Sequence, residues 1–197
     1  MNNIDNFNIL DSKIFTLNYI EYLTKVLNGI EPNQIESFVE CLLETREKDG
    51  TIYFIGNGGS AATASHFVND LSVGLSNKGK PFKAICLSDN VPSITAIGND
   101  ESFDLIFLNQ VKAFLTKKDL LVAISASGNS LNLVNCFEYA INQNIQTFSI
   151  TAFDGGRLKE ISNKYIHIKT NKGEYGPAED AHMIIDHLVT SFLSRYI

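Results

Sequence analysis

Two histidines and two carboxylates in this sequence lie at spacings that would let them share a site. His66 and Asp70 are four residues apart in a segment with helical periodicity, so they share one face of that helix. Glu179 and His187 lie on the last predicted helix, residues 178–196. Two imidazoles and two carboxylates are a donor set for zinc or another divalent transition metal. The alternative is a solvated polar face, the usual role of charged residues on a helix.

The last predicted helix carries more titratable groups on one side than an ordinary surface helix. Glu179, His182, Asp186 and His187 fall within an arc of about 140° around its axis. The opposite side, predicted to face the core, is formed by Ala181, Ile184, Ile185 and Leu188. We interpret His182 and Asp186 either as groups that orient the ligands of a metal or as solvent-facing polar residues.

A glycine-rich loop follows the strand predicted at residues 51–55. Its sequence, Gly56-Asn57-Gly58-Gly59-Ser60, leads into a helical segment. Glycines let the backbone turn sharply with its N–H groups exposed, and the helix N-terminus adds partial positive charge, so the loop favours an anion. The loop lacks the lysine of a P-loop and the spacing of a dinucleotide fingerprint. A tight turn without a ligand is the alternative.

A second loop of similar character follows the strand predicted at residues 120–124. Its sequence, Ser125-Ala126-Ser127-Gly128-Asn129-Ser130, places three hydroxyl groups beside the N-terminus of a helix. Ser130 could serve only as the helix N-cap, but that role explains one serine and not three. Ligands of open α/β sheets bind beyond the carboxyl ends of the strands. The two loops together predict a site for a phosphorylated small molecule.

Carboxylates and histidines beside a sugar-phosphate pocket suit proton transfer at a carbon next to a carbonyl. A base removes the proton, and an acid or a metal stabilises the enediolate that forms. This combination indicates aldose–ketose isomerisation.

Strands and helices alternate along the chain after residue 50. Runs rich in β-branched and aromatic residues predict strands at 51–55, 84–87, 120–124, 147–150 and 165–168. Helical patterns lie between and after them, at 61–75, 103–114, 131–142, 156–161 and 178–196. This order predicts an α/β fold with a doubly wound, open, parallel five-stranded sheet flanked by helices.

The segment before the first predicted strand has helical periodicity and no strand pattern. Residues 10–48 predict two helices with a long apolar stripe, interrupted by Gly29 and Pro32. We expect residues 1–197 to form a single domain, in which residues 1–50 are an N-terminal helical hairpin that packs in a subunit interface.

The composition argues against several classes of function. The 197 residues carry a formal charge of −6, which disfavours nucleic acid as a partner. There is no run of about 18 apolar residues that would span a membrane, and the first residues lack the basic and apolar regions of a secretory signal. Cys41, Cys86 and Cys136 are far apart and are expected to be buried thiols in a reducing compartment. His167 lies inside a predicted strand and is expected to be structural.

At these motifs the sequence resembles the sugar isomerase (SIS) domain family, and within it the phosphoheptose isomerases. The resemblance covers most of the chain. Its most specific parts are the loop 56–60 with His66, the segment Ala96-Ile97-Gly98-Asn99-Asp100, the loop 125–130, and the closing helix that carries His187. Together these parts are far more specific than either loop alone.

The resemblance implies a reaction and a set of site residues. The reaction is the conversion of sedoheptulose 7-phosphate to D-glycero-D-manno-heptose 7-phosphate through an enediol. Asp70 would be the general base and His187 the partner acid or base, and zinc would be held by His66, Asp70, Glu179 and His187. The phosphosugar would be bound by Asn57, Gly58, Gly59, Ser60, Asp70, Asn99, Asp100, Ser125, Ala126, Ser127, Ser130 and Glu179. The family is typically a cytoplasmic homotetramer with active sites between subunits, and it serves heptose synthesis for lipopolysaccharide or capsule.

This chain departs from the family pattern at three of these positions. The family usually has glutamate in place of Asp70, glutamine in place of Glu179 and threonine in place of Ala126. The shorter Asp70 must sit differently, and an added negative charge at Glu179 favours a bound cation. These departures leave open an isomerase or epimerase of another sugar phosphate. A non-catalytic phosphosugar-binding regulator is a further alternative, although His66, Asp70 and His187 all remain capable of chemistry. A nucleotide-binding enzyme lacks both of its expected motifs.

Overall fold

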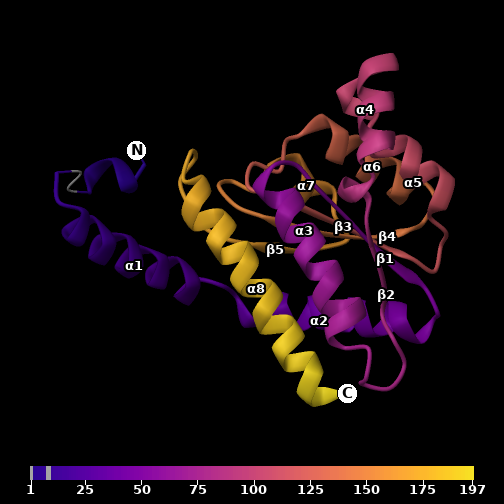
Figure 1. Cartoon of the computed structure of the whole chain (residues 1–197), viewed down its shortest axis with the longest axis horizontal. Helices are drawn as coiled ribbons and strands as arrows, with labels where there is room; N and C mark the ends of the chain where they lie inside the picture. The colour runs from indigo at the N-terminus through magenta and orange to yellow at the C-terminus, as the bar shows by residue number, and fades with distance from the viewer. Residues whose placement is uncertain (1, 8–9) are drawn as a thin grey trace.

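A five-stranded parallel sheet forms the centre of the computed structural model, which describes residues 2–7 and 10–197. The strand order is β2-β1-β3-β4-β5 (Figure 1). The strands are β1 (Thr51–Gly56), β2 (Lys83–Cys86), β3 (Leu120–Ser125), β4 (Gln146–Thr151) and β5 (Lys164–His167). Each lies within about one residue of its sequence prediction, and the predicted doubly wound parallel fold is confirmed.

Helices cover both faces of the sheet and create two apolar cores. Successive residues of a strand point to opposite faces, so Ile52 and Phe54 of β1 belong to one core while Tyr53 and Ile55 belong to the other. The first core lies under α2 (Pro32–Glu47), α3 (Gly59–Asn69) and α8 (Tyr175–Tyr196). The second lies under α5 (Leu108–Phe114), α6 (Leu131–Asn142) and α7 (Gly156–Ile161). Burial on both faces explains why the strands read as continuous apolar runs.

The strand order brings the two loops predicted to bind an anion together. β1 and β3 are hydrogen-bonded neighbours, and Gly56 pairs with Ile124 near the carboxyl end of each strand. From β1 the chain crosses through α3 to β2, whereas from β3 it crosses through α6 to β4 in the other direction. β1 and β3 therefore flank the topological switch point, where open α/β sheets bind their ligands.

The last helix buries a different face from the one predicted. The residues of α8 that are buried lie three or four apart and include Ala178, Ala181, His182, Ile185, Asp186, Val189 and Leu193. Leu188, which was predicted to face the core, is 46% exposed. The stripe through Ile185, Val189 and Leu193 fixes the rotation of the helix, and His182 and Asp186 lie within that stripe. The solvent-facing interpretation of His182 and Asp186 is therefore wrong, because both side chains are fully buried.

The two N-terminal helices have different surroundings. α1 (Ser12–Asn28) starts at Asp11, whose carboxylate accepts hydrogen bonds from the backbone N–H groups of Lys13 and Ile14. It extends away from the sheet, whereas α2 lies against it (Figure 1). Tyr19 of α1 donates a hydrogen bond to Asp180 of α8 at 2.6 Å. An apolar side of α1 that contains Leu17 and Ile20 stays exposed.

The chain between β1 and β3 contains the largest departures from the predicted helices. α4 (Val91–Asp100), which was not predicted, projects from one end of the molecule (Figure 1). The segment 103–114 is divided into the short 3-10 turn η4 (Phe103–Leu105) and α5, and another such turn, η3 (Leu87–Asp89), follows β2. The segment 61–75 changes after Asn69 from α-helix to a π-helical turn, η2 (Asp70–Gly74). A 3-10 turn, η1 (Ile4–Asn6), precedes α1.

Candidate active site

Three of the four residues predicted to bind a metal meet where α3 lies beside α8. The Nε2 atoms of His66 and His187 are 3.2 Å apart. A carboxylate oxygen of Asp70 lies 3.6 Å from His66 Nε2. Both histidines are exposed, so the cluster can be reached from solvent. Residues 121 positions apart thus form one polar group, as the sequence predicted for His66 and His187.

The fourth member of this group is Asp186, and Glu179 lies elsewhere. Ligand atoms of His66, Asp70, Asp186 and His187 all lie within 4.8 Å of one another. The Glu179 carboxylate lies instead against Gly59, where an added Cβ would come within 2.3 Å of its Oε2 atom. The physical reason is distance along α8, because eight residues of helix separate Glu179 from His187 by about 12 Å. The predicted set of four ligands did not take this separation along the helix axis into account.

Asp186 is in an unusual electrostatic environment. Its side chain is fully buried, and neither carboxylate oxygen has a hydrogen-bond partner among the residues that the structure describes. Burial, and next to it the nearby charge of Asp70, raises the pKa of Asp186 to about 8. Buried polar groups are normally paired. The unpaired carboxylate of Asp186, with one oxygen near the two imidazoles and the second carboxylate, fits a divalent cation.

The π-helical turn positions Asp70. α3 ends at Asn69, and Asp70 begins the wider turn that follows. Asn69 Nδ2 donates a hydrogen bond to Asp70 Oδ1 at 3.0 Å, while Oδ2 faces His66. Single π-turns occur often at functional sites. The sequence pattern showed only a continuous helix here.

The first predicted anion loop has the geometry of a cradle. Gly58 has φ +54°, a conformation that favours glycine. Ser60 is buried in the first turn of α3, whose N-terminus contributes partial positive charge. Asn57 exchanges two side-chain hydrogen bonds with Asn132 of α6, at 3.0 and 2.9 Å. This amide pair ties the first loop to the helix that follows the second loop.

The second predicted loop uses two of its three serines to hold its own shape. Ser125 Oγ accepts a hydrogen bond from the backbone N–H of Gly128 at 3.0 Å, and Ser127 Oγ accepts one from that of Asn129 at 3.3 Å. Ser130 is the N-cap residue of α6, yet its side chain makes no capping bond. Its hydroxyl is therefore not committed to capping. Ala126, between Ser125 and Ser127, is buried, and its carbonyl accepts a hydrogen bond from the backbone N–H of Ala152.

Asn99 and Asp100 lie at the exposed end of α4. Their side chains bond to each other, with Asn99 Nδ2 donating to Asp100 Oδ1 at 2.7 Å. The figure shows α4 projecting away from the end of the sheet (Figure 1). The structure of one chain therefore does not unite these two residues with the histidine cluster.

Two residues near the loops were missed by sequence reasoning. Asn132 forms the amide pair with Asn57, and Ser88 binds the end of β1, since its hydroxyl donates to the Gly56 carbonyl at 2.9 Å. An asparagine in the first turn of a helix and a serine after a strand are common in any sequence. Only the parallel pairing of β1 with its neighbours brings them to the site.

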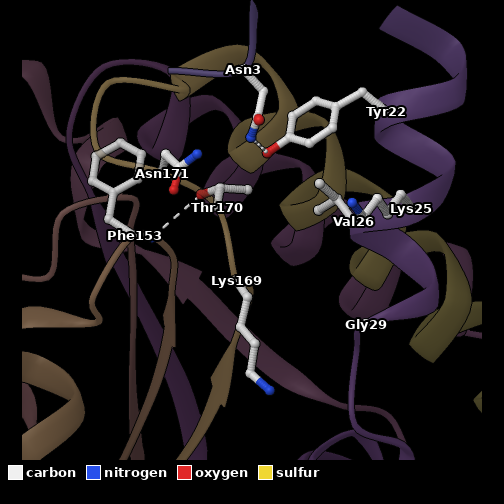
Figure 2. Close-up of a pocket in the computed structure, with 9 residues that line it drawn as sticks. All are labelled: Asn3, Tyr22, Lys25, Val26, Gly29, Phe153, Lys169, Thr170 and Asn171. Atoms are coloured by element: carbon white, nitrogen blue, oxygen red, sulfur yellow. Dashed lines mark hydrogen bonds between the residues drawn. The ribbon is translucent and has the colours of Figure 1, made fainter. Parts of the chain in front are cut away.

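A separate polar hollow of about 330 Å³ lies between α1 and the ends of β4 and β5 (Figure 2). Figure 2 shows Tyr22, Lys25 and Val26 of α1 facing Phe153 and the segment 169–171 across it. Its lining residues are Asn3, Tyr22, Lys25, Val26, Gly29, Phe153, Lys169, Thr170 and Asn171. None of them belongs to the histidine cluster or to the two anion loops, so this hollow is distinct from the candidate active site.

Among the described residues, no helix has the length and apolar character needed to cross a membrane. His167 is buried at the end of β5, and burial lowers its pKa, which agrees with a structural role. The three cysteines are buried and free, as expected.

Comparison with known proteins gives a consistent result. A family model described as SIS domain matches residues 18–152. A probable phosphoheptose isomerase of Thermoplasma volcanium is 33% identical over 98% of this chain and 97% of its own length. A phosphoheptose isomerase of Helicobacter pylori is 32% identical over 89% of this chain and 90% of its own. The structure of a phosphoheptose isomerase from Francisella tularensis superposes with a TM-score of 0.85 at 26% identity, covering 94% of this chain and 99% of that one.

Proposed function

The chain belongs to the SIS domain family, and from that premise we propose that it is an aldose–ketose isomerase that converts sedoheptulose 7-phosphate to D-glycero-D-manno-heptose 7-phosphate. Relatives that cover almost the whole chain are phosphoheptose isomerases by name. The observation that carries the proposal is the group formed by His66, Asp70 and His187. Its member His66 lies on α3, the helix whose N-terminus forms an anion cradle.

The phosphate is assigned to the two loops at the switch point. The N-termini of α3 and α6 both point partial positive charge at this edge of the sheet. The hydroxyl of Ser130, which makes no capping bond, is a hydrogen-bond donor for a phosphate oxygen. Ser125 and Ser127 hold the loop in shape and keep their own O–H groups as donors. We therefore assign phosphate binding to these serines and to Ser60 in the first turn of α3, and sugar binding to Asn57.

The proton transfers are assigned to Asp70 and His187. The Asp70 carboxylate removes a proton from C1 of the ketose, and the electron pair forms the C1=C2 double bond as the C2 oxygen takes a proton from the His187 imidazolium. The carboxylic acid then returns the proton to C2 while neutral His187 accepts the proton of the C1 hydroxyl, which leaves an aldehyde at C1. Both groups return to their initial protonation states, as acid–base catalysis requires.

A divalent metal, zinc in our proposal, is compatible with this site. His66, Asp70 and His187 would hold it, and their ligand atoms are 3.2 and 3.6 Å apart. A tetrahedral zinc site with bonds of about 2.0–2.1 Å separates its ligand atoms by about 3.3 Å. When bound, the metal would keep His187 as a neutral imidazole and would replace its proton as the electrophile, because it would polarise the carbonyl and stabilise the negative charge of the enediolate.

We further propose a cytoplasmic homotetramer in which α1 packs on other subunits. Ile14, Leu17 and Ile20 form an apolar side of α1 that is exposed in one chain. Assembly would cover that side and would also offer partners to Asn99 and Asp100 on the projecting α4. The biological role we assign is heptose synthesis for lipopolysaccharide or capsule.

A second candidate is isomerisation of a different sugar phosphate, and one observation favours it. The Glu179 carboxylate lies against Gly59 inside the first cradle, where the family usually has an uncharged glutamine. An additional negative charge there changes which sugar hydroxyls can be accommodated.

The experiment that tests both candidates is turnover of sedoheptulose 7-phosphate by the purified protein with and without zinc, followed by NMR of the anomeric protons. A metal-dependent heptose 7-phosphate signal is the expected result. If only another sugar phosphate reacts, the second candidate replaces the first. If no sugar phosphate reacts while several raise the melting temperature, the protein is a binder and the proposed function fails.

A further inference from the structure

The buried end of the histidine cluster contains a carboxylate that the proposed reaction does not use. Asp186 is fully buried on α8, directly before His187. Neither of its oxygens has a hydrogen-bond partner in the described part of the chain. Its Oδ2 lies 4.0 Å from His66 Nε2, which is too long for a hydrogen bond. Asp186 is therefore not explained as a group that orients His66 in the present geometry.

The position of Asp186 completes a coordination set. The four ligand atoms of His66, Asp70, Asp186 and His187 lie within 4.8 Å of one another. The distances from His66 Nε2 to the other residues, 3.2, 3.6 and 4.0 Å, are close to the spacing of about 3.3 Å in a tetrahedral site. The remaining pairs lie within 4.8 Å, so side-chain movements of up to about 1.5 Å would bring all four into contact with one ion.

The charges of the four groups also match a divalent cation. Two neutral imidazoles and two carboxylates carry a total of −2, which a divalent cation neutralises. Glu179 cannot take this place while its carboxylate lies against Gly59.

We propose that Asp186 is a direct ligand of the metal and that it replaces Glu179 in the ligand set. This inference rests on the proposed metal site. It follows that the metal is bound through the buried side of α8 and that Glu179 is left free beside the first cradle.

The test is binding of Co²⁺ to metal-free full-length protein, measured by the visible absorption of the bound ion and by competition with a chelator. Asp186→Asn, which is nearly isosteric, is expected to weaken Co²⁺ binding at least about 10-fold. Glu179→Gln, a matched carboxylate-to-amide change on the same helix, is expected to stay within about twofold of wild type. Equal binding by Asp186→Asn and wild type would overturn the inference, as would an equal loss in Glu179→Gln.

A cysteine variant gives a direct spectroscopic signature. Asp186→Cys places a thiol at the proposed ligand position, and Co²⁺ bound there is expected to show a thiolate-to-cobalt charge-transfer band in the near ultraviolet. A bound ion without that band would contradict direct ligation, even if Asp186→Asn fails to fold. If wild type itself binds no Co²⁺, the metal part of the proposed function fails along with the inference. If wild type and Asp186→Asn bind equally, only the inference fails.

Discussion

The two anion loops and the histidine cluster satisfy their polar groups in opposite ways. In the loops, serine hydroxyls accept backbone N–H bonds and the amides of Asn57 and Asn132 bond to each other. In the cluster, Asp186 is buried with no hydrogen-bond partner among the described residues. The loops are therefore preorganised by the fold itself, whereas the Asp186 carboxylate would gain a partner from the metal that we propose. Polar residues whose hydrogen bonds are made within the fold are expected mainly to stabilise the site. Polar residues without such partners are expected to act in it.

The largest effect is expected from removing a histidine of the cluster. His187→Ala is predicted to lower kcat about 10²- to 10⁴-fold, because it removes a proton-transfer group. The exposed side chain packs little, so the melting temperature of the metal-free protein should hardly change. Steady-state kinetics and a thermal melt measure both quantities. Near-normal turnover would remove the cluster from the reaction.

A methyl group on Gly128 is expected to have the largest effect on stability. Gly128 has φ +65°, and an added Cβ would lie 2.0 Å from the backbone oxygen of Gly155. Gly128→Ala is predicted to cost at least about 1–3 kcal/mol from its backbone conformation alone. Urea unfolding measures the change.

Gly59→Ala is the matched control for that prediction. Its Cβ would meet the end of the flexible Glu179 side chain, which can move away. We expect a smaller loss of stability, and the double variant Gly59→Ala/Glu179→Ala should recover it. If Gly59→Ala is the more damaging change, the second loop is less rigid than the structure indicates.

The serines of the second loop allow a sharper comparison. Ser125→Ala leaves the buried N–H of Gly128 unpaired and is predicted to cost about 1–3 kcal/mol of unfolding free energy. Ser130→Ala breaks no capping bond, so its stability should remain within about 0.5 kcal/mol of wild type while KM rises. Denaturant unfolding and kinetics on both variants test this division. The reverse pattern would mean that Ser130 stabilises and Ser125 binds.

The smallest predicted effect is a slope in the pH dependence of stability. Burial lowers the pKa of His182 to about 4 in the fold, below its unfolded value of about 6.5. Between these pH values the imidazole of His182 is protonated in the unfolded chain and neutral in the folded chain. His182 therefore contributes stability that is lost as pH falls from about 6.5 to 4. The expected slope is at most about 1.4 kcal/mol per pH unit.

The difference between wild type and His182→Gln in chemical unfolding at several pH values isolates this contribution. Because both proteins contain Asp186, its titration cancels in the difference. A difference that does not change with pH would show that His182 titrates normally.

The strands could be predicted because burial on both faces of the sheet requires a continuous run of apolar residues. The runs at β1 and β3 are continuous and apolar, and glycine or polar residues end them. The sequence of α4 has no comparable apolar pattern, because the helix projects from the molecule and buries none of its residues completely. Its start at Asn90, whose side chain accepts from the Ser93 N–H, was the available signal.

The sequence pattern placed several titratable side chains on shared helix faces, but it did not give the geometry of the cluster. Spacing on one helix gives the angle between side chains and puts His66 beside Asp70. It does not give the rotation of α8, which the packing of Ile185 and Val189 decides. It also does not show that the Glu179 carboxylate lies against the backbone of Gly59. The positions of Glu179 and Asp186 relative to the cluster therefore required tertiary structure, as did the pairing of Asn57 with Asn132.

α3 joins the two functions of the proposed site in one rigid element. Gly59 at its N-terminus borders the first cradle, and His66 on the same helix belongs to the cluster. Seven residues of α-helix span about 10 Å and cannot stretch. The helix therefore fixes the distance between the first cradle and the cluster. A substrate that binds to both must carry its phosphate and its reacting carbon at that separation. Carbon-chain length, before any pattern of hydroxyl groups, would be the first property by which this site selects a sugar.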